Sequence, residues 1–417
     1  MKMKLVIFFY CNIVISQTMV NLGYVYMYED KDMNYFTGKL NQTEEWLACQ
    51  VTNFKDETNL DSEIKFLSFN DEKKKTEYAS MLTKINPLFK KPYFAYRFNW
   101  SKSVNNKFYF LRNENDIKGY FTGYFDDNPS YKVFQYSIET IHLGGEKLTP
   151  TSSYVVINDD DGDGDGDIYY ISNGGENSDR GNIKIKTPSE SIEYSNSISH
   201  YETLSDFDVY YNEDKLEYNL ALTIIDGGEN RDVFYYSDIQ YISNSSLGRK
   251  VEPSDFHQLD PKFNYNGTLV AFLSQVSDGT DEYDIYIYNT STNESKLIAQ
   301  NVYSAQKKGT RPDYETLDYC WHPFRNIIFY VALVGKNENK QIKYCNIDSF
   351  ECYDLETNTI ENSNITISPK GNFLLFQTLG YQVGDKHFDN CNKNKDNKAC
   401  CSGTANTKLA IAKISLN

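Results

Sequence analysis

The chain has 417 residues, enough to bury a large core as one repeat domain or as two ordinary domains. Tyrosine and phenylalanine are heavily used, at 35 and 25 residues, and this aromatic enrichment favours β-strands. Lysine and arginine together number 42 against 58 aspartates and glutamates, so the formal net charge is −16. Such an acidic balance argues against nucleic acid and anionic membranes as partners.

The N-terminal segment has the features of a cleaved secretory signal. Lys2 and Lys4 precede an apolar run over 5–15, and small residues close the run. The run is too short to span a bilayer, and no later stretch approaches that length. We predict a signal peptide over 1–16, a single domain over 17–417 and a secreted or cell-surface location. A buried β-strand is the alternative interpretation of the run.

Sequons and cysteines agree with export. Asn-x-Ser/Thr sequons, the acceptors of N-glycosylation, occur at Asn41, Asn99, Asn244, Asn266, Asn289, Asn293 and Asn364. Cys11 would leave with the signal, and the cysteines that remain are Cys49, Cys320, Cys345, Cys352, Cys391, Cys400 and Cys401. We expect disulfides, with Cys345 and Cys352 joining neighbouring strands across a short turn. The remaining number is odd, so one thiol is free or pairs between molecules. Zinc is the alternative, without a CxxC pair or histidine spacing in its favour.

Short aromatic strands separated by turn signals follow one another along the chain. The predicted strands or hairpins lie at 23–29, 35–40, 46–54, 63–69, 93–100, 107–111, 117–125, 154–171, 220–236, 269–288, 326–345 and 372–414. Only 72–82 has a pattern that suits a short helix, and it suits an exposed loop equally well. Regular short strands without helices predict an all-β fold, as a sandwich array or a propeller.

Several hairpin loops share one skeleton. In each loop an Asp-Gly pair lies six residues before the aspartate that opens the next strand. The three pairs begin at Asp161, Asp226 and Asp278. Hairpin tips fall near residues 72, 114, 163, 229, 281, 337 and 390, which makes seven similar units. One four-stranded sheet per unit is the blade of a β-propeller. We predict seven blades, with six as the alternative. The strands over 23–40 are expected to complete the sheet of 408–414 and to close the ring.

A second repeat lies between the hairpins. Phe263–Phe272 and Ile367–Phe376 share a turn ending in Gly and then an apolar strand, and Trp321–Phe329 is a copy without the Gly. With the Asp284-Ile-Tyr sequence, these segments resemble the TolB-type, WD40-like propeller repeat. The resemblance covers 256–378 and is faint before residue 150. It implies a fold class, typically six-bladed, and transfers no catalytic residues.

The Asp-rich loop over 158–167 is the sharpest site signal. With Asp159 as position 1, the carboxylates at positions 1, 3, 5 and 9 and the backbone carbonyl at position 7 can point to one ion. The candidate ligands are therefore Asp159, Asp161, Asp163, Asp165 and Asp167. Glycines curl the loop so that alternate residues point inward and form the oxygen cage that Ca²⁺ requires. The pattern resembles the calcium loops of FG-GAP (integrin-type) propellers. The alternative is a flexible acidic tip, because Asp and Gly are good turn residues. The related loops at Asp226 and Asp278 lack the alternation and are predicted to be ordinary tips.

Catalytic motifs are missing from the sequence: there is no HExxH, no GxSxG and no P-loop. We therefore predict an exported, calcium-stabilised propeller that serves as a scaffold binding a protein or glycan at one end, with no catalytic residue assigned. The alternative is a propeller enzyme, a polysaccharide lyase or hydrolase acting on acidic sugars, which TolB-like propellers of the oligogalacturonate-lyase type suggest. A purely structural surface or wall protein is a third hypothesis, and fold alone does not choose among them.

Overall fold

A computed structural model describes the strands and the shorter turns of the chain. The described residues are 19–28, 33–53, 62–69, 94–101, 107–114, 117–125, 136–141, 154–156, 168–173, 181–186, 191–193, 203–212, 214–215, 217–225, 231–237, 248–251, 256–277, 280, 282–304, 318–335, 339–381 and 407–417. They form strands and turns only, so the predicted all-β class is confirmed for them. No helix that could cross a membrane occurs in this part of the chain. The predicted signal peptide, the segment 72–82, the Asp-rich loop and the last three cysteines lie outside the described residues.

Consecutive strands pair antiparallel into successive sheets. The first four sheets contain, in turn, β2 (Met33–Leu40), β3 (Trp46–Asn53) and β4 (Ser62–Ser68); β5 (Phe94–Trp100), β6 (Lys107–Glu114), β7 (Ile117–Phe125) and β8 (Tyr136–Ile141); β9 (Tyr154–Val156), β10 (Ile168–Asn173), β11 (Gly181–Lys186) and β12 (Ser191–Glu193); β13 (Thr203–Asn212), β14 (Glu217–Ile225), β15 (Arg231–Tyr236) and β16 (Arg249–Lys250).

The remaining strands form one long sheet, a final sheet and a small pair. The long sheet contains β17 (Gln258–Phe263), β18 (Leu269–Gln275), β19 (Glu282–Asn289), β20 (Glu294–Tyr303), β21 (Tyr319–Trp321), β22 (Ile327–Val334), β23 (Asn339–Asn346) and β24 (Glu351–Asp354). The final sheet contains β26 (Ser363–Ile367), β27 (Phe373–Thr378), β29 (Lys408–Leu416) and β1 (Val20–Tyr28), and β25 (Thr359–Ile360) pairs with β28 (Gly380–Tyr381). A single residue pair, Val302 with Ala332, joins β20 to β22, so the long sheet consists of two four-stranded parts.

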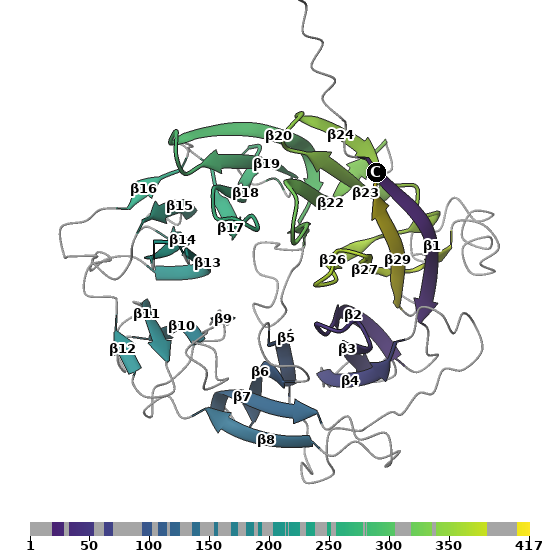
Figure 1. The fold of residues 1–417 in the computed structure, drawn as a ribbon, viewed down its shortest axis with the longest axis horizontal. Helices are drawn as coiled ribbons and strands as arrows, with labels where there is room; N and C mark the ends of the chain where they lie inside the picture. Colours follow the sequence, from purple (N-terminus) through teal and green to yellow (C-terminus); the bar gives the residue numbers. More distant parts are fainter. Residues whose placement is uncertain are drawn as a thin grey trace, which may run out of the picture.

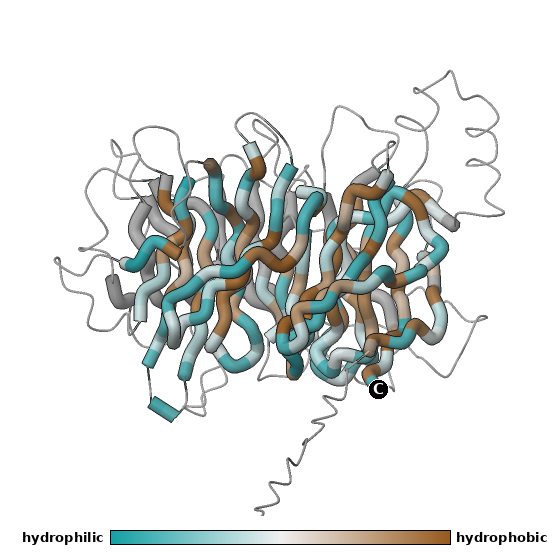
Figure 2. The backbone as a smooth tube through the Cα atoms, turned by 90° about the horizontal axis from the view of Figure 1, so that it is seen from above, coloured by the Kyte–Doolittle hydropathy of each residue, from teal (hydrophilic) through white to brown (hydrophobic). Residues whose placement is uncertain are grey.

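The sheets follow one another around a common centre, and in the final sheet β26 lies nearest to it while β1 lies at the outer edge (Figure 1). Seen from the side, the strands run between the two ends of a flattened ring (Figure 2). This is the arrangement of a β-propeller, in which each sheet is covered on its faces by its neighbours.

Apolar side chains fill the space between neighbouring sheets. One buried cluster joins β17–β20 to β21–β23, and another joins β22 and β23 to β26, β27 and β29. Leu47 and Leu375, both fully buried, belong to a third cluster between β3 and β27. β18, β22 and β27 are buried along nearly their whole length, so both faces of these strands pack against neighbouring sheets.

The N-terminal strands divide between two sheets. β1 pairs with β29, from Val20 opposite Leu416 to Tyr28 opposite Leu409. The segment over 33–40, expected to join the same sheet, instead forms β2 and pairs with β3. Only the first of the two N-terminal strands therefore adds to the C-terminal sheet.

The hairpin loops that share the Asp-Gly skeleton do not occupy equivalent places, so this part of the predicted repeat is wrong. The Asp-rich loop connects β9 to β10, the first and second strands of their sheet. The loops at Asp226 and Asp278 connect the second and third strands, β14 to β15 and β18 to β19. The tip predicted near residue 72 lies between two sheets, after β4 and before β5.

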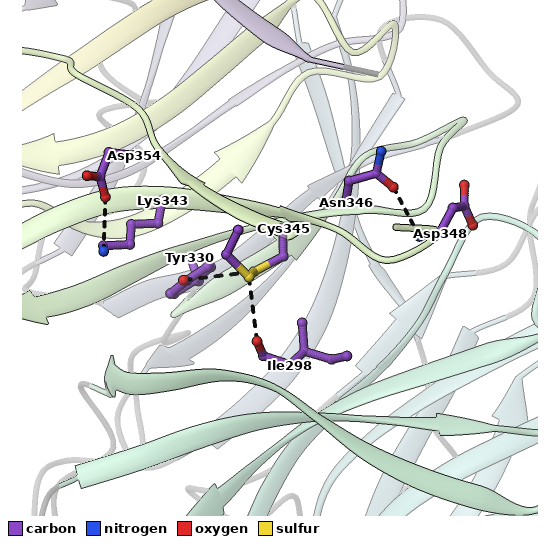
Figure 3. Close-up of a disulfide and its surroundings, with 8 residues drawn as sticks. Ile298, Tyr330, Lys343, Cys345, Asn346, Asp348 and Asp354 are labelled. Atoms are coloured by element: carbon purple, nitrogen blue, oxygen red, sulfur yellow. Dashed lines mark hydrogen bonds and ion pairs between the residues drawn. A yellow bond between two sulfur atoms is a disulfide. The ribbon is translucent and has the colours of Figure 1, made fainter. Parts of the chain in front are cut away.

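The predicted disulfide between Cys345 and Cys352 is present and links β23 to β24 (Figure 3). The Tyr330 hydroxyl lies 3.9 Å from Cys345 Sγ, and the Ile298 carbonyl oxygen of β20 lies 3.5 Å from Cys352 Sγ. The disulfide therefore sits where the two parts of the long sheet meet.

Removing this disulfide in the C345S/C352S double variant should lower the free energy of unfolding by about 2–3 kcal/mol, because a short loop is no longer constrained in the unfolded chain. Urea denaturation of the full chain measures the loss. C320S, which removes a half-buried thiol outside the disulfide, should change stability by less than about 1 kcal/mol. Equal losses in the two variants would contradict the assignment.

Candidate functional site

The turns between the first and second strands of three neighbouring sheets share one capping pattern. The residue that opens each turn offers a side-chain acceptor: Asn264 Oδ1 accepts from Leu269 N at 3.0 Å, His322 Nδ1 from Phe324 N at 3.2 Å, and Ser368 Oγ from Asn372 N at 3.1 Å and Phe373 N at 3.0 Å. Gly267 and Gly371 have φ of +68° and +73°, which explains their recurrence in the sequence repeat. The repeat identified over 256–378 is thus a capped turn.

A fourth copy of this turn lies outside the range of the sequence resemblance, at 41–46. Asn41 N donates to Trp46 O at 2.9 Å, and Asn41 Oδ1 accepts from Glu45 N and Trp46 N, both at 3.0 Å. Glu44 takes the place of the glycine, with φ of +63°. This copy is absent from the sequence repeat because it has neither a glycine nor a proline, and each of the other copies has at least one of the two. The Asn-x-Thr sequence that opens the turn was the available signal.

Neighbouring turns contact one another. The contacts that join them are Asn264 Nδ2 to Asn326 Oδ1 at 2.9 Å, Lys370 Nζ to Thr43 O at 2.9 Å and Asn372 Nδ2 to Glu44 Oε2 at 3.1 Å. The Tyr210 ring of β13 lies against Gly267, and the His322 ring lies against Gly371. These contacts run from sheet to sheet along one end of the ring.

Exposed aromatic rings gather at this same end. Tyr265 and Phe324 are 44% and 54% exposed in their turns, and Phe350, 51% exposed, follows in the turn between β23 and β24. Ile347 N donates to Asn326 O at 2.8 Å, so this last turn lies beside the turn of Phe324. We name this end the turn face; its described turns are 41–46, 264–268, 290–293, 322–326, 347–350 and 368–372. Among the described residues whose side-chain exposure is defined, every strongly exposed aromatic side chain lies on it.

Ionisable groups gather on the inner strands of three adjoining sheet units. Lys262 Nζ lies 2.8 Å from Asp260 Oδ2 and 3.0 Å from Tyr319 O, and it is 4.2 Å from the centre of the Tyr319 ring. The Tyr319 hydroxyl donates to the carbonyl oxygens of Asp260 and, at 2.9 Å, Ala271. Asp208 Oδ2 accepts from Phe263 N at 2.8 Å. These groups form hydrogen bonds with one another between sheet units, so their role is to hold neighbouring sheet units together.

The pKa of Asp260 gives this cluster a pH dependence. Burial raises that pKa to about 7, although the Lys262 ammonium opposes the rise. In the unfolded chain an aspartate has a pKa of about 3.9. Between these pH values the folded state holds a proton that the unfolded state has released. The contribution of Asp260 to the free energy of unfolding is therefore fully present below about pH 4 and is lost as the pH rises to about 7.

D260N should remove this dependence. From pH 4 to pH 8 the wild-type free energy of unfolding should fall relative to D260N by at most about 4 kcal/mol, at about 1.4 kcal/mol per pKa unit. Urea denaturation across this pH range gives the difference. Parallel profiles for the two proteins would contradict the assigned role of Asp260.

The two described histidines accept hydrogen bonds from backbone amides. His257 Nδ1 accepts from Arg231 N at 3.2 Å. His322 caps its turn, and burial together with Arg325 lowers its pKa to about 4, so it is neutral at physiological pH. The predicted structural role of His322 agrees with this geometry. His142, His200 and His387 lie outside the described residues.

The candidate calcium ligands Asp159, Asp161, Asp163, Asp165 and Asp167 all lie outside the described residues, so their geometry stays a prediction. Within the described part of the chain, no group of three or more His, Cys, Asp or Glu side chains has the arrangement to hold a metal ion.

No protein-family model and no curated protein sequence matches the chain. Among solved structures, oligogalacturonate lyase from Vibrio parahaemolyticus has 9% identity and a TM-score of 0.48, covering 95% of this chain and 96% of that one. An oligogalacturonate lyase in complex with manganese has 9% identity, a TM-score of 0.45 and the same coverage. TolB from Acinetobacter baumannii has 11% identity and a TM-score of 0.40, covering 78% of this chain and 64% of that one. At these values the similarities carry no argument about activity, and the propeller assignment rests on the sheets themselves.

Proposed function

We propose that this chain is an exported β-propeller that serves as a scaffold and binds a protein or glycan ligand on its turn face. The observation that carries the proposal is the gathering of Tyr265, Phe324 and Phe350, exposed, at one end of the ring. Exposed aromatic rings mark binding surfaces, since each offers a large contact area at a small cost in conformational entropy.

Seven blades are the architecture we propose beneath this face. The sheets that begin at β2, β5, β9, β13 and β26 supply five, and the two parts of the long sheet supply the others. β1 would close the ring, since it brings the N-terminal strand into the C-terminal sheet. Cleavage after residue 16 would leave β1 complete, in keeping with export of the chain.

A catalytic role is the second candidate, as a lyase or hydrolase acting on acidic sugars. Such chemistry needs basic groups or histidines free to reach a substrate. Lys262 is bound to Asp260 and Tyr319, and both described histidines are engaged by backbone amides. These contacts favour the binding scaffold over the enzyme.

A glycan array and a uronate-lyase assay on the full chain test the two candidates together. We expect ligand binding without bond cleavage, and at least about tenfold weaker binding by the Y265A/F324A variant, because central aromatic anchors dominate binding energy. V276A is the matched control, since Val276 is 43% exposed but lies between β18 and β19 at the opposite end of the ring. Cleavage of uronate oligomers by the unaltered chain would overturn the scaffold proposal.

Calcium would stabilise the Asp-rich loop, in the register that begins at Asp159. We expect millimolar Ca²⁺ to raise the melting temperature by several degrees, since a ligand at about 100 times its Kd contributes about 2.7 kcal/mol. EDTA should reverse the rise, and D161N/D163N should abolish it. D278N, in a loop without the alternation of carboxylates, is the control and should keep the full response.

A further inference from the structure

Three of the described sequons, at Asn41, Asn364 and Asn293, differ in the contacts of their amide nitrogens. Asn41 is 1% exposed, and its Nδ2 donates to Thr43 Oγ1 at 3.0 Å. Asn364 Nδ2 donates to Gln377 Oε1 at 2.9 Å from a half-buried position. N-glycosylation converts this nitrogen into the attachment point of a bulky sugar, so a glycan at either position would displace a contact within the fold.

Asn293 has the opposite surroundings. It lies in the exposed run over 291–294, between β19 and β20, with φ of +59°. Its Oδ1 accepts from the Tyr288 hydroxyl at 2.8 Å, and no described residue accepts a hydrogen bond from its Nδ2. A sugar on Nδ2 leaves Oδ1 in place, so the contact with Tyr288 and the turn would both persist.

We propose that Asn293 is an N-glycosylation site and that Asn41 stays unmodified. The donor is an oligosaccharide on a polyprenyl diphosphate. A bond forms between Asn293 Nδ2 and the anomeric carbon of the sugar, the bond from that carbon to the diphosphate oxygen breaks, the amide nitrogen loses one proton and the polyprenyl diphosphate leaves. The inference rests on the proposed export, because this donor is found in the secretory pathway.

The glycan would stand on the turn face. Thr290, at the start of the same turn, donates through its backbone N to Thr268 O at 3.0 Å, so the turn of Asn293 lies beside that of Tyr265. A sugar at Asn293 would therefore border the proposed ligand surface and limit which partners approach it from that side.

The test expresses the full chain in eukaryotic cells in two forms, one with its own residues 1–16 and one with a proven cleavable signal in their place. Peptide N-glycosidase, an amidase that hydrolyses the side-chain amide and so converts each glycosylated Asn to Asp, followed by peptide mass spectrometry, locates the modified residues. We expect the Asn293 peptide to be converted and the Asn41 peptide to be unchanged. N293Q and S295A should each remove one and the same glycan from the intact mass. S295A leaves the Asn293 side chain in place, which covers the case where N293Q fails to fold.

T43A is the control, since it destroys the Asn41 sequon and should leave the intact mass of the glycan unchanged. An unmodified Asn293 in chain recovered from the medium would overturn the inference, as would a converted Asn41. If Asn293 is modified only in the form that carries the proven signal, residues 1–16 do not direct export. That result would refute the proposed export but would support Asn293 as a glycosylation site.

Discussion

Replacing Gly267 by alanine should lower the free energy of unfolding by about 2–4 kcal/mol, because strain and a steric clash act together at this position. Two costs combine at this position. The residue has φ of +68°, where an L side chain is strained, and an added Cβ would lie 2.1 Å from the Tyr210 ring of the preceding sheet. The ring is held on β13, which leaves little room for it to move.

Gly335 separates the two costs. It has φ of +74°, but no atom lies within 4 Å of the Cβ that alanine would add. G335A should therefore lose only about 1 kcal/mol, because the strain is partly offset by the lower entropy of the unfolded chain. Urea denaturation of both variants gives the comparison. Similar losses of unfolding free energy for G267A and G335A would mean that the Tyr210 ring moves aside, and that β13 is not closely packed against the turn of Gly267.

The class of fold was predictable from the sequence because its signals are local. Aromatic and polar residues alternate along the strands, and each turn carries residues suited to it, so strands and loops could be placed without knowing their neighbours. The disulfide between Cys345 and Cys352 was predictable for the same reason, since both residues flank one short turn.

The order of strands within each sheet was less predictable. An Asp-Gly loop suits any antiparallel hairpin, so the sequence around Asp161 and Asp226 looks alike although the first segment follows the first strand of its sheet and the second follows a second strand. Which strand comes first in a sheet depends on pairing with a third strand and on packing against the next sheet. Neither leaves a local mark in the sequence.

The candidate site was predictable only in part. The turns at 264–268 and 368–372 were found through their glycines, whereas the turn at 41–46 was hidden because Glu44 adopts the same backbone conformation. The hydrogen bonds around Lys262 could not be predicted from the sequence, because Tyr319 and its partners come from strands far apart in the chain. The exposure of Phe324 likewise follows from the assembled turns and cannot be read from an aromatic residue in a turn.

Asn41 provides the second large effect, because its buried side chain holds the turn at 41–46 together. In N41A the backbone amides of Glu45 and Trp46 lose the oxygen that both now contact at 3.0 Å. An unsatisfied buried donor costs about 1–3 kcal/mol, and the outward amide of Glu45 can turn to water, so we expect a loss of about 2–4 kcal/mol. The melting temperature and the urea midpoint of the full chain measure it.

The repeat itself supplies the rescue. Ser368, at the equivalent position, accepts from Asn372 N and Phe373 N with its hydroxyl oxygen, so a serine is chemically able to cap this turn. N41S should recover at least about half of the stability that N41A loses, since a side-chain oxygen again reaches the turn amides. N339A, at an exposed position whose side chain makes no hydrogen bond to a described residue, should cost less than about 1 kcal/mol and controls for the loss of an asparagine as such. If N41S were as unstable as N41A, the turn at 41–46 would not be a copy of the turn at 368–372, and the sheet that begins at β2 would be held by contacts of another kind.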